Sequence, residues 1–263
     1  AHWAWLTRAQ RPFVRFALGE FGQVLAQRDD KGRPYLLIGG QAVYFWAFRY
    51  AAQERSIEQW RPFTSKDLDF QGGRDDVLRL AKELGLRAQL PHSREITALA
   101  GIVPLQIGGS STTVEVVRLI AGVRPGVVEK SAAEYEFAEH RVRVVDPISL
   151  LSCKLYLALK VDQKERRDVE HLRIMLLCVR AFLRETLRGV EAGTLPARGW
   201  LGAVERVLKL AESTRGKKAV RTLGMDWTQA LPLTEIAASD HRAAIRFHEK
   251  RLVQWQAKLA RPA

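Results

Sequence analysis

The stretch that decides the fold reads Arg61-Pro62-Phe63-Thr64-Ser65-Lys66-Asp67-Leu68-Asp69-Phe70. Polar and apolar residues alternate from Asp67 to Phe70, a pattern typical of a half-buried strand. Successive side chains on a strand point to opposite faces, so Asp67 and Asp69 share one face. Two carboxylates so close repel each other unless a cation neutralises them, and hard oxygen ligands suit Mg²⁺. For an Asp-x-Asp pair taken alone, a solvated edge strand is the alternative.

A glycine pair upstream is the second informative feature. The apolar run at residues 35–38 has the length of a strand, Gly39-Gly40 ends it, and residues 41–50 have the pattern of a buried helix. Glycine permits close backbone approach, and the unpaired amides at a helix start favour a phosphate. This pattern therefore predicts an anion-binding turn, with a plain tight turn as the alternative.

An isolated acid is the third feature. Glu115 stands in the apolar run Val114-Glu115-Val116-Val117. A buried carboxylate is costly without a partner, so Glu115 needs a metal, a base or a hydrogen-bond network. A structural salt bridge with an arginine is the alternative.

The order of elements changes near Asp146. Before it, the sequence predicts helices at residues 11–27 and 75–84, strands at 103–107, 112–120 and 136–145, and a hairpin connection at 108–111. Asp146 is a predicted helix cap with Pro147 at the first helical position. Helices are then expected at residues 148–160, 166–189, 199–213 and 237–260. The sequence predicts an α+β protein, with a mixed-sheet domain over residues 1–146 and a helical domain over 147–263.

Composition narrows the class of protein. The chain of 263 residues has no apolar run near the ~20 residues that cross a bilayer, and its first residues lack the order of a signal peptide. Cys153 and Cys178 are expected to be buried free thiols, which favours a cytoplasmic location. The 42 Lys and Arg residues against 29 Asp and Glu give a net charge of +13. That charge favours polyanionic partners, with a merely soluble basic surface as the alternative.

Together these features resemble the nucleotidyltransferase superfold. The segment from Arg61 to Phe70, with Ile38-Gly39-Gly40 upstream, is similar to the AbiEii-type nucleotidyltransferases, the toxin half of type IV toxin–antitoxin systems. The resemblance continues through Val114–Val117, through the segment from Asp146 to Lys154, and through Arg166-Arg167-Asp168-Val169-Glu170-His171-Leu172. The residues after Leu172 carry none of it.

The resemblance implies roles for the acidic residues. In such enzymes the Asp pair binds the metal, Mg²⁺ or Mn²⁺, which maps onto Asp67 and Asp69. Glu115 would complete the carboxylate set, by holding a second metal ion or by acting as base on the incoming hydroxyl. Glu115 departs from the family pattern, where Asp is more usual. Residues 51–60 look like an insertion, since the spacing from Gly40 to Asp67 is longer than the family's.

The resemblance also implies a lysine and an acid after the sheet. The family's later lysine maps onto Lys154, which would neutralise nucleotide phosphate as a point charge. The acid of its basic–Asp motif maps onto Asp168, which would orient Lys154 or a nucleotide hydroxyl; an interdomain ion pair is the alternative for both. His171 stands where the motif commonly has a second Asp, and we interpret it as a core histidine. The implied nucleotide-binding set is Gly39, Gly40, Lys66 and Lys154.

The implied reaction transfers a nucleoside monophosphate from an NTP to an acceptor and releases pyrophosphate. The basic chain suits an RNA acceptor, and the family analogy suggests tRNA and a cognate antitoxin as partners. Three basic clusters are candidates for following a phosphate backbone, although each alone is more often a solvated helix face: residues 164–167, 215–218 and 242–251. One alternative is a small-molecule transferase of the aminoglycoside-modifying kind, whose acceptor pocket would be acidic. The other is a non-catalytic nucleic-acid- or antitoxin-binding module on the same fold.

Overall fold

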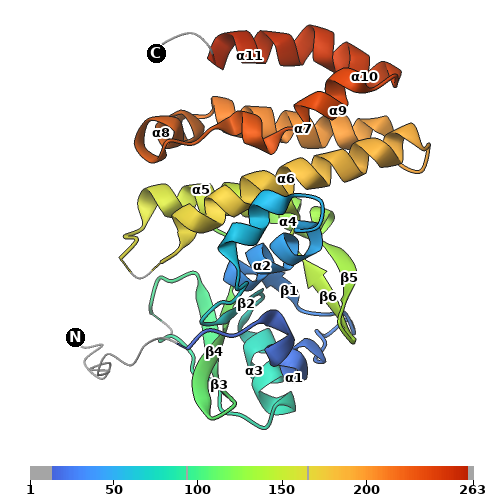
Figure 1. Cartoon of the computed structure of the whole chain (residues 1–263). Helices are drawn as coiled ribbons and strands as arrows, with labels where there is room; N and C mark the ends of the chain where they lie inside the picture. Colours follow the sequence, from blue (N-terminus) through green and yellow to red (C-terminus); the bar gives the residue numbers. More distant parts are fainter. Residues whose placement is uncertain (1–13, 93, 165, 260–263) are drawn as a thin grey trace.

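The computed structural model describes residues 14–92, 94–164 and 166–259. Within these residues, a six-stranded mixed sheet lies beneath stacked layers of helices, so the predicted α+β class is confirmed (Figure 1). The strand order is β3-β4-β2-β1-β6-β5. The strands are β1 (Leu36–Ile38), β2 (Leu68–Gln71), β3 (Leu99–Ile107), β4 (Ser110–Val117), β5 (Ala133–Phe137) and β6 (His140–Val144).

The register of three strands aligns the acidic residues. β1 pairs antiparallel with β2, and Ile38 lies opposite Asp69. β2 pairs parallel with β4, and Asp69 lies opposite Glu115. Residues directly opposite in a sheet project to the same face, so Asp69 and Glu115 share one face, and Asp67 lies immediately before the first residue of β2.

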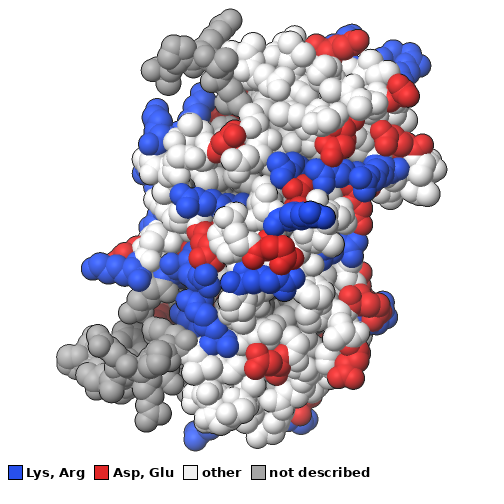
Figure 2. All heavy atoms as spheres, in the orientation of Figure 1, with Lys and Arg blue, Asp and Glu red and all other residues white. Residues whose placement is uncertain are grey.

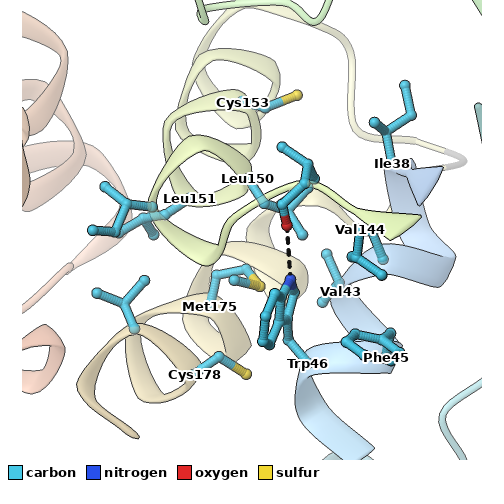
Figure 3. Packing of buried hydrophobic residues seen from close by; sticks show 14 of the residues in the cluster. Ile38, Val43, Phe45, Trp46, Val144, Leu150, Leu151, Cys153, Met175 and Cys178 are labelled. Atoms are coloured by element: carbon cyan, nitrogen blue, oxygen red, sulfur yellow. Dashed lines mark hydrogen bonds between the residues drawn. The ribbon is translucent and has the colours of Figure 1, made fainter. Parts of the chain in front are cut away.

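Helices surround the sheet, and α2 contributes the most buried residues among them. Trp46 of α2 points at the chain after β6 and donates from Nε1 to the carbonyl of Val145 at 3.0 Å (Figure 3). Met175 lies beside this contact in the same view, so α2 packs between the sheet and the helical half. The helices of this half are η1 (Leu18–Phe21), α1 (Gly22–Leu25), α2 (Gly39–Tyr50), η2 (Arg55–Trp60), α3 (Arg74–Glu83) and α4 (Pro125–Ser131).

The helical half begins where the sheet ends. Asp146 caps the first helix and accepts hydrogen bonds from the amides of Ile148 and Ser149, each at 3.1 Å. Two long helices lie next to the sheet half, and the remainder stack above them in two further layers (Figure 1). The apolar core runs without interruption from the sheet into these helices. They are α5 (Pro147–Lys160), α6 (Asp168–Glu191), α7 (Ala197–Glu212), α8 (Thr214–Leu223), η3 (Trp227–Ala230), α9 (Leu233–Ala238), α10 (Arg242–Phe247), η4 (His248–Leu252) and α11 (Val253–Leu259).

Several predicted elements are wrong in detail. The helix expected at residues 11–27 is a 3-10 turn followed by the four-residue α1, and residues 11–13 lie outside the described residues. The strand expected at 136–145 is the hairpin β5–β6, which turns at Ala138 with φ +50°. Helices α4 and α8 were not predicted, and the helix expected at 237–260 is divided among α9, α10, η4 and α11.

The two cysteines confirm a prediction made from composition. Cys153 and Cys178 are free and buried, as predicted. Over the described part of the chain, no helix combines the length and the apolar character that crossing a membrane requires.

Candidate active site

The turn between β1 and α2 is built around the carboxylate of Asp69. Gly39 has φ +67°, a conformation that favours glycine, and a Cβ atom at this position would lie 1.8 Å from Asp69 Oδ2. The backbone of Gly40 forms a hydrogen bond with the Asp69 carboxylate, which lowers its pKa. The first turn of α2 therefore holds Asp69 in place, and one of the amides expected to face a phosphate is used by a protein carboxylate.

Asp69 lies within electrostatic reach of two other carboxylates. Burial, together with the charges of Asp67 and Glu115, raises the pKa of Asp69 to about 8. Burial and the charge of Asp67 also raise the pKa of Glu115, against the opposing charges of Lys66 and Arg166. The structure thus gathers on one face the three acids that the sequence pattern pointed to, and they repel one another.

This donor set fits a divalent cation only in part. In the residues that the structure describes, no three His, Cys, Asp or Glu side chains are gathered closely enough to hold a metal ion by themselves. Mg²⁺ is commonly bound by one or two carboxylates, with water and substrate phosphates completing its octahedral shell. Asp67 and Asp69 fit that arrangement, because a cation between them would relieve their mutual repulsion.

A serine missed by the sequence analysis orients Asp67. Ser65 Oγ donates to Asp67 Oδ1 at 3.2 Å, and Lys66 Nζ lies 3.7 Å from Asp67 Oδ2. The backbone of Ser65 pairs with that of Phe16 through two hydrogen bonds of 2.8 and 3.0 Å. Gly40 is also constrained, because a Cβ atom there would lie 2.6 Å from Ser65 Oγ. Only its position two residues before Asp67 could have drawn attention to Ser65.

Lys154 and Asp168 form a buried ion pair beside these acids. Lys154 Nζ donates to Asp168 Oδ1 at 3.0 Å, and the two residues are 4% and 2% exposed. Arg166 Nε donates to the other oxygen of Asp168 at 2.5 Å. Although burial opposes ionisation, Lys154 and Arg166 lower the pKa of Asp168 to about 2. The charge of Lys154 also lowers the pKa of Asp69, so the helical half contributes directly to the electrostatics of the carboxylate cluster.

Arg166 belongs to this site rather than to an isolated basic surface. In the sequence it belongs to the basic cluster at residues 164–167, of which residue 165 lies outside the described residues. The negative charges of Asp168, Asp69 and Asp67 raise the pKa of Arg166 against the effect of burial. Its side chain is 41% exposed, so it joins the buried pair to the solvent-facing side of the site.

His171 is buried behind the glycine turn. Its Nε2 lies 3.1 Å from the hydroxyl of Tyr44, and its Cε1 would lie 3.4 Å from a Cβ atom on Gly40. Burial and the nearby charge of Lys154 lower the pKa of His171 well below its ordinary value, so the imidazole is neutral near pH 7. Its position agrees with the interpretation as a core histidine.

Comparisons with known proteins include a weak structural likeness. No protein-family model matches the chain, and no curated protein matches it. Among solved structures, it is similar to the crystal structure of an antigenic nucleotidyltransferase-like protein from Paracoccidioides brasiliensis. The two are 16% identical, the match covers 62% of this chain and 78% of that one, and the TM-score is 0.42. A likeness at this level carries no conclusion about activity.

The contact between Gly39 and Asp69 predicts an unequal pair of substitutions. Gly39→Ala and Gly85→Ala both place a side chain at positive φ, at +67° and +65°, but only residue 39 has an atom within 4 Å of the new Cβ. We expect Gly85→Ala to lose about 1 kcal/mol of unfolding free energy and Gly39→Ala at least about 2 kcal/mol more, because Asp69 must move. Urea denaturation followed by circular dichroism measures both, and equal losses would refute the close contact.

The raised pKa of Asp69 predicts a pH-dependent stability. The folded protein retains a proton on Asp69 up to about pH 8, whereas the unfolded chain releases it near the ordinary value of 3.8. The stability that this proton contributes is present at low pH and is lost as pH rises from about 4 to about 8. Asp69→Asn cannot ionise, so it should gain stability relative to wild type as pH rises. Urea midpoints at pH 5 and pH 8.5 in EDTA test this, and parallel pH profiles would contradict it.

Proposed function

We propose that this chain is a metal-dependent nucleotidyltransferase, which transfers a nucleoside monophosphate from an NTP to an acceptor hydroxyl and releases pyrophosphate. One observation carries the proposal. Asp69 rests on the positive-φ glycine at the start of α2, directly opposite Glu115 in the parallel register and within reach of the charge of Lys154. A helix start, paired carboxylates and a buried lysine together can bind a nucleoside triphosphate and its cation.

Each acidic residue has a distinct part in this proposal. Asp67 and Asp69 would hold Mg²⁺ or Mn²⁺, with Ser65 keeping Asp67 oriented. A bound cation of this kind neutralises phosphate charge and aligns the reacting oxygens. Glu115 would hold a second cation or accept the proton of the acceptor hydroxyl at its carboxylate. A pKa raised by burial, as for Glu115, suits a general base.

The basic residues would bind the triphosphate. Lys154 carries a compact charge at the edge of the carboxylate cluster, and Asp168 holds its ammonium group in place at 3.0 Å. Lys66 lies on the same side, beside Asp67. Gly39 and Gly40 would contribute through the backbone amides at the start of α2 that Asp69 does not use, because the side chains of Asp69 and Ser65 fill the space beside their α-carbons.

The acceptor we propose is RNA, with tRNA the candidate that the resemblance to AbiEii-type toxins implies, and with a cognate antitoxin as partner. The net charge of +13 supports a polyanionic acceptor over a polycationic small molecule. A non-catalytic binding module on the same fold is the rival. The observation that favours this rival is that no three donor side chains among the described residues gather closely enough to bind a metal ion.

A transfer assay separates these functions. The protein is incubated with each α-³²P-labelled NTP and total RNA, in Mg²⁺, in Mn²⁺ and in EDTA. We expect label on RNA only with a divalent cation, and Asp67→Asn or Asp69→Asn should lower the rate at least about 100-fold while the protein stays folded. If both variants label RNA as fast as wild type, Asp67 and Asp69 are not needed for the reaction. Binding of RNA without any labelling under all conditions would favour the non-catalytic module.

Lys154 has a matched control on its own helix. Lys154→Arg keeps the charge but replaces a compact ammonium with a planar fork that does not fit the buried pair with Asp168. Lys160→Arg makes the same change at an exposed position on α5. We expect Lys154→Arg to raise the KM for NTP or lower kcat at least about tenfold, and Lys160→Arg to match wild type. Equal kinetics for the two variants would make Lys154 a structural residue only.

A further inference from the structure

Helix α8 carries a charge that the fold does not explain. Its ten residues include four basic side chains and no acid: Arg215, Lys217, Lys218 and Arg221. Three of the four lie in its N-terminal half, where the helix dipole disfavours cations. Its buried face consists of Gly216 and Ala219, whereas Lys217, Lys218 and Arg221 are exposed. Lys217, Lys218 and Arg221 therefore contribute little packing, and the two lysines also oppose the helix dipole.

Two basic residues of the outermost layer have acidic partners. Arg251 pairs with Glu205 and with Glu212, and Lys258 lies 4.0 Å from Glu212. No ion pair involves Lys218 or Arg221 in the part of the chain that the structure describes. The charge in the outermost layer is thus partly neutralised, whereas the charge on α8 faces solvent.

The position of α8 links it to the candidate active site. It packs against α5, the helix that carries Lys154. The guanidinium of Arg215 lies 5.4 Å from the centre of the Tyr156 ring on α5. The ring is itself fixed, because Gly122 approaches it so closely that a Cβ there would lie 2.8 Å from Tyr156 Cβ. Arg215 therefore anchors α8 on α5, the helix that carries Lys154 on a different face.

Basic side chains continue from α8 toward the sheet. Figure 2 shows Lys and Arg recurring down the left-hand side of the molecule, from the level of α8, past that of α5, to that of the sheet. Near the site, Arg166 is partly exposed on Asp168, and its charge reaches Asp69 and Asp67. Positive charge thus extends from the outer helical layers to the carboxylate cluster.

We propose that the exposed face of α8 docks the phosphate backbone of a single-stranded RNA whose end lies at the carboxylates. This inference rests on the function proposed above, of which it names the acceptor surface. A phosphate chain is complementary to a row of cations, and the positive end of the helix dipole favours the same anions. A single strand fits because its terminal hydroxyl must reach the acids while its backbone follows the basic side chains.

Two triple variants with equal charge change test the location. The first is Lys217→Glu, Lys218→Glu and Arg221→Glu on α8. The second is Arg242→Glu, Arg246→Glu and Lys250→Glu, three exposed residues of α10 and η4. Binding of a fluorescein-labelled single-stranded RNA is followed by anisotropy at several salt concentrations, without NTP. We expect the α8 variant to weaken binding at least about tenfold and to reduce the salt slope by about 2, and the other to stay within about threefold of wild type.

Each other outcome overturns the proposal. Equal weakening by both variants would mean that only total charge matters. If the α8 variant binds RNA normally, this face does not bind RNA, and an acidic protein partner becomes the favoured occupant. If the glutamate variant fails to fold by circular dichroism, the variant with Gln at the same three positions replaces it, with the same expected direction.

The assay also separates this inference from the proposed function. RNA binding is measured without NTP and therefore without transfer, so it reports on the docking surface alone. If no transfer occurs with any NTP but the α8 variant alone loses RNA binding, the enzyme assignment fails and the docking surface stands. If transfer occurs and the α8 variant transfers and binds normally, the docking surface fails and the enzyme assignment stands.

Discussion

The carboxylate of Asp69 occupies the space where a side chain on residue 39 would begin, and the rest of the site depends on that contact. It requires glycine with φ +67° at the end of β1, and so determines where α2 starts. The antiparallel register then fixes Asp69 opposite Ile38, and the parallel register fixes Glu115 opposite Asp69. Backbone pairing thereby brings three separate segments of the chain together at the contact between Asp69 and Gly39.

The helical half completes this site through charge rather than through shape. Lys154 and Asp168 are both almost wholly buried, and a buried charge is tolerated only when its partner is present. The two residues come from α5 and α6, so the pair also fixes the relative position of these helices. Because the charge of Lys154 acts on Asp69, loss of either member of the pair would alter the carboxylate cluster in the other half.

The sequence predicted those parts of the site that depend on local pattern. Alternation placed Asp67 and Asp69 on one face, and the glycine pair located the start of α2. The sequence placed Arg166 in a basic cluster. Its contact with Asp168 is local, but Asp168 joins the site only through Lys154 of α5, and no local pattern contains that packing of α5 against α6. The β5–β6 hairpin was missed because it turns at Ala138, a non-glycine residue at positive φ, and no glycine, proline or asparagine marks the turn in the sequence.

Under the proposed function, the charges at the site suit a divalent cation bound to a nucleoside triphosphate better than a bare divalent cation. Three carboxylates repel one another, yet Lys154, Lys66 and Arg166 already lie close enough to lower the pKa of Asp69 or Glu115. These basic groups would oppose a bare divalent cation, and no three donor side chains in the described residues gather tightly enough to offset them. Phosphate oxygens would satisfy the basic groups and the cation together. Under the proposed function, the nucleotide is thus itself part of the metal site, and its triphosphate neutralises the same lysines that hold it.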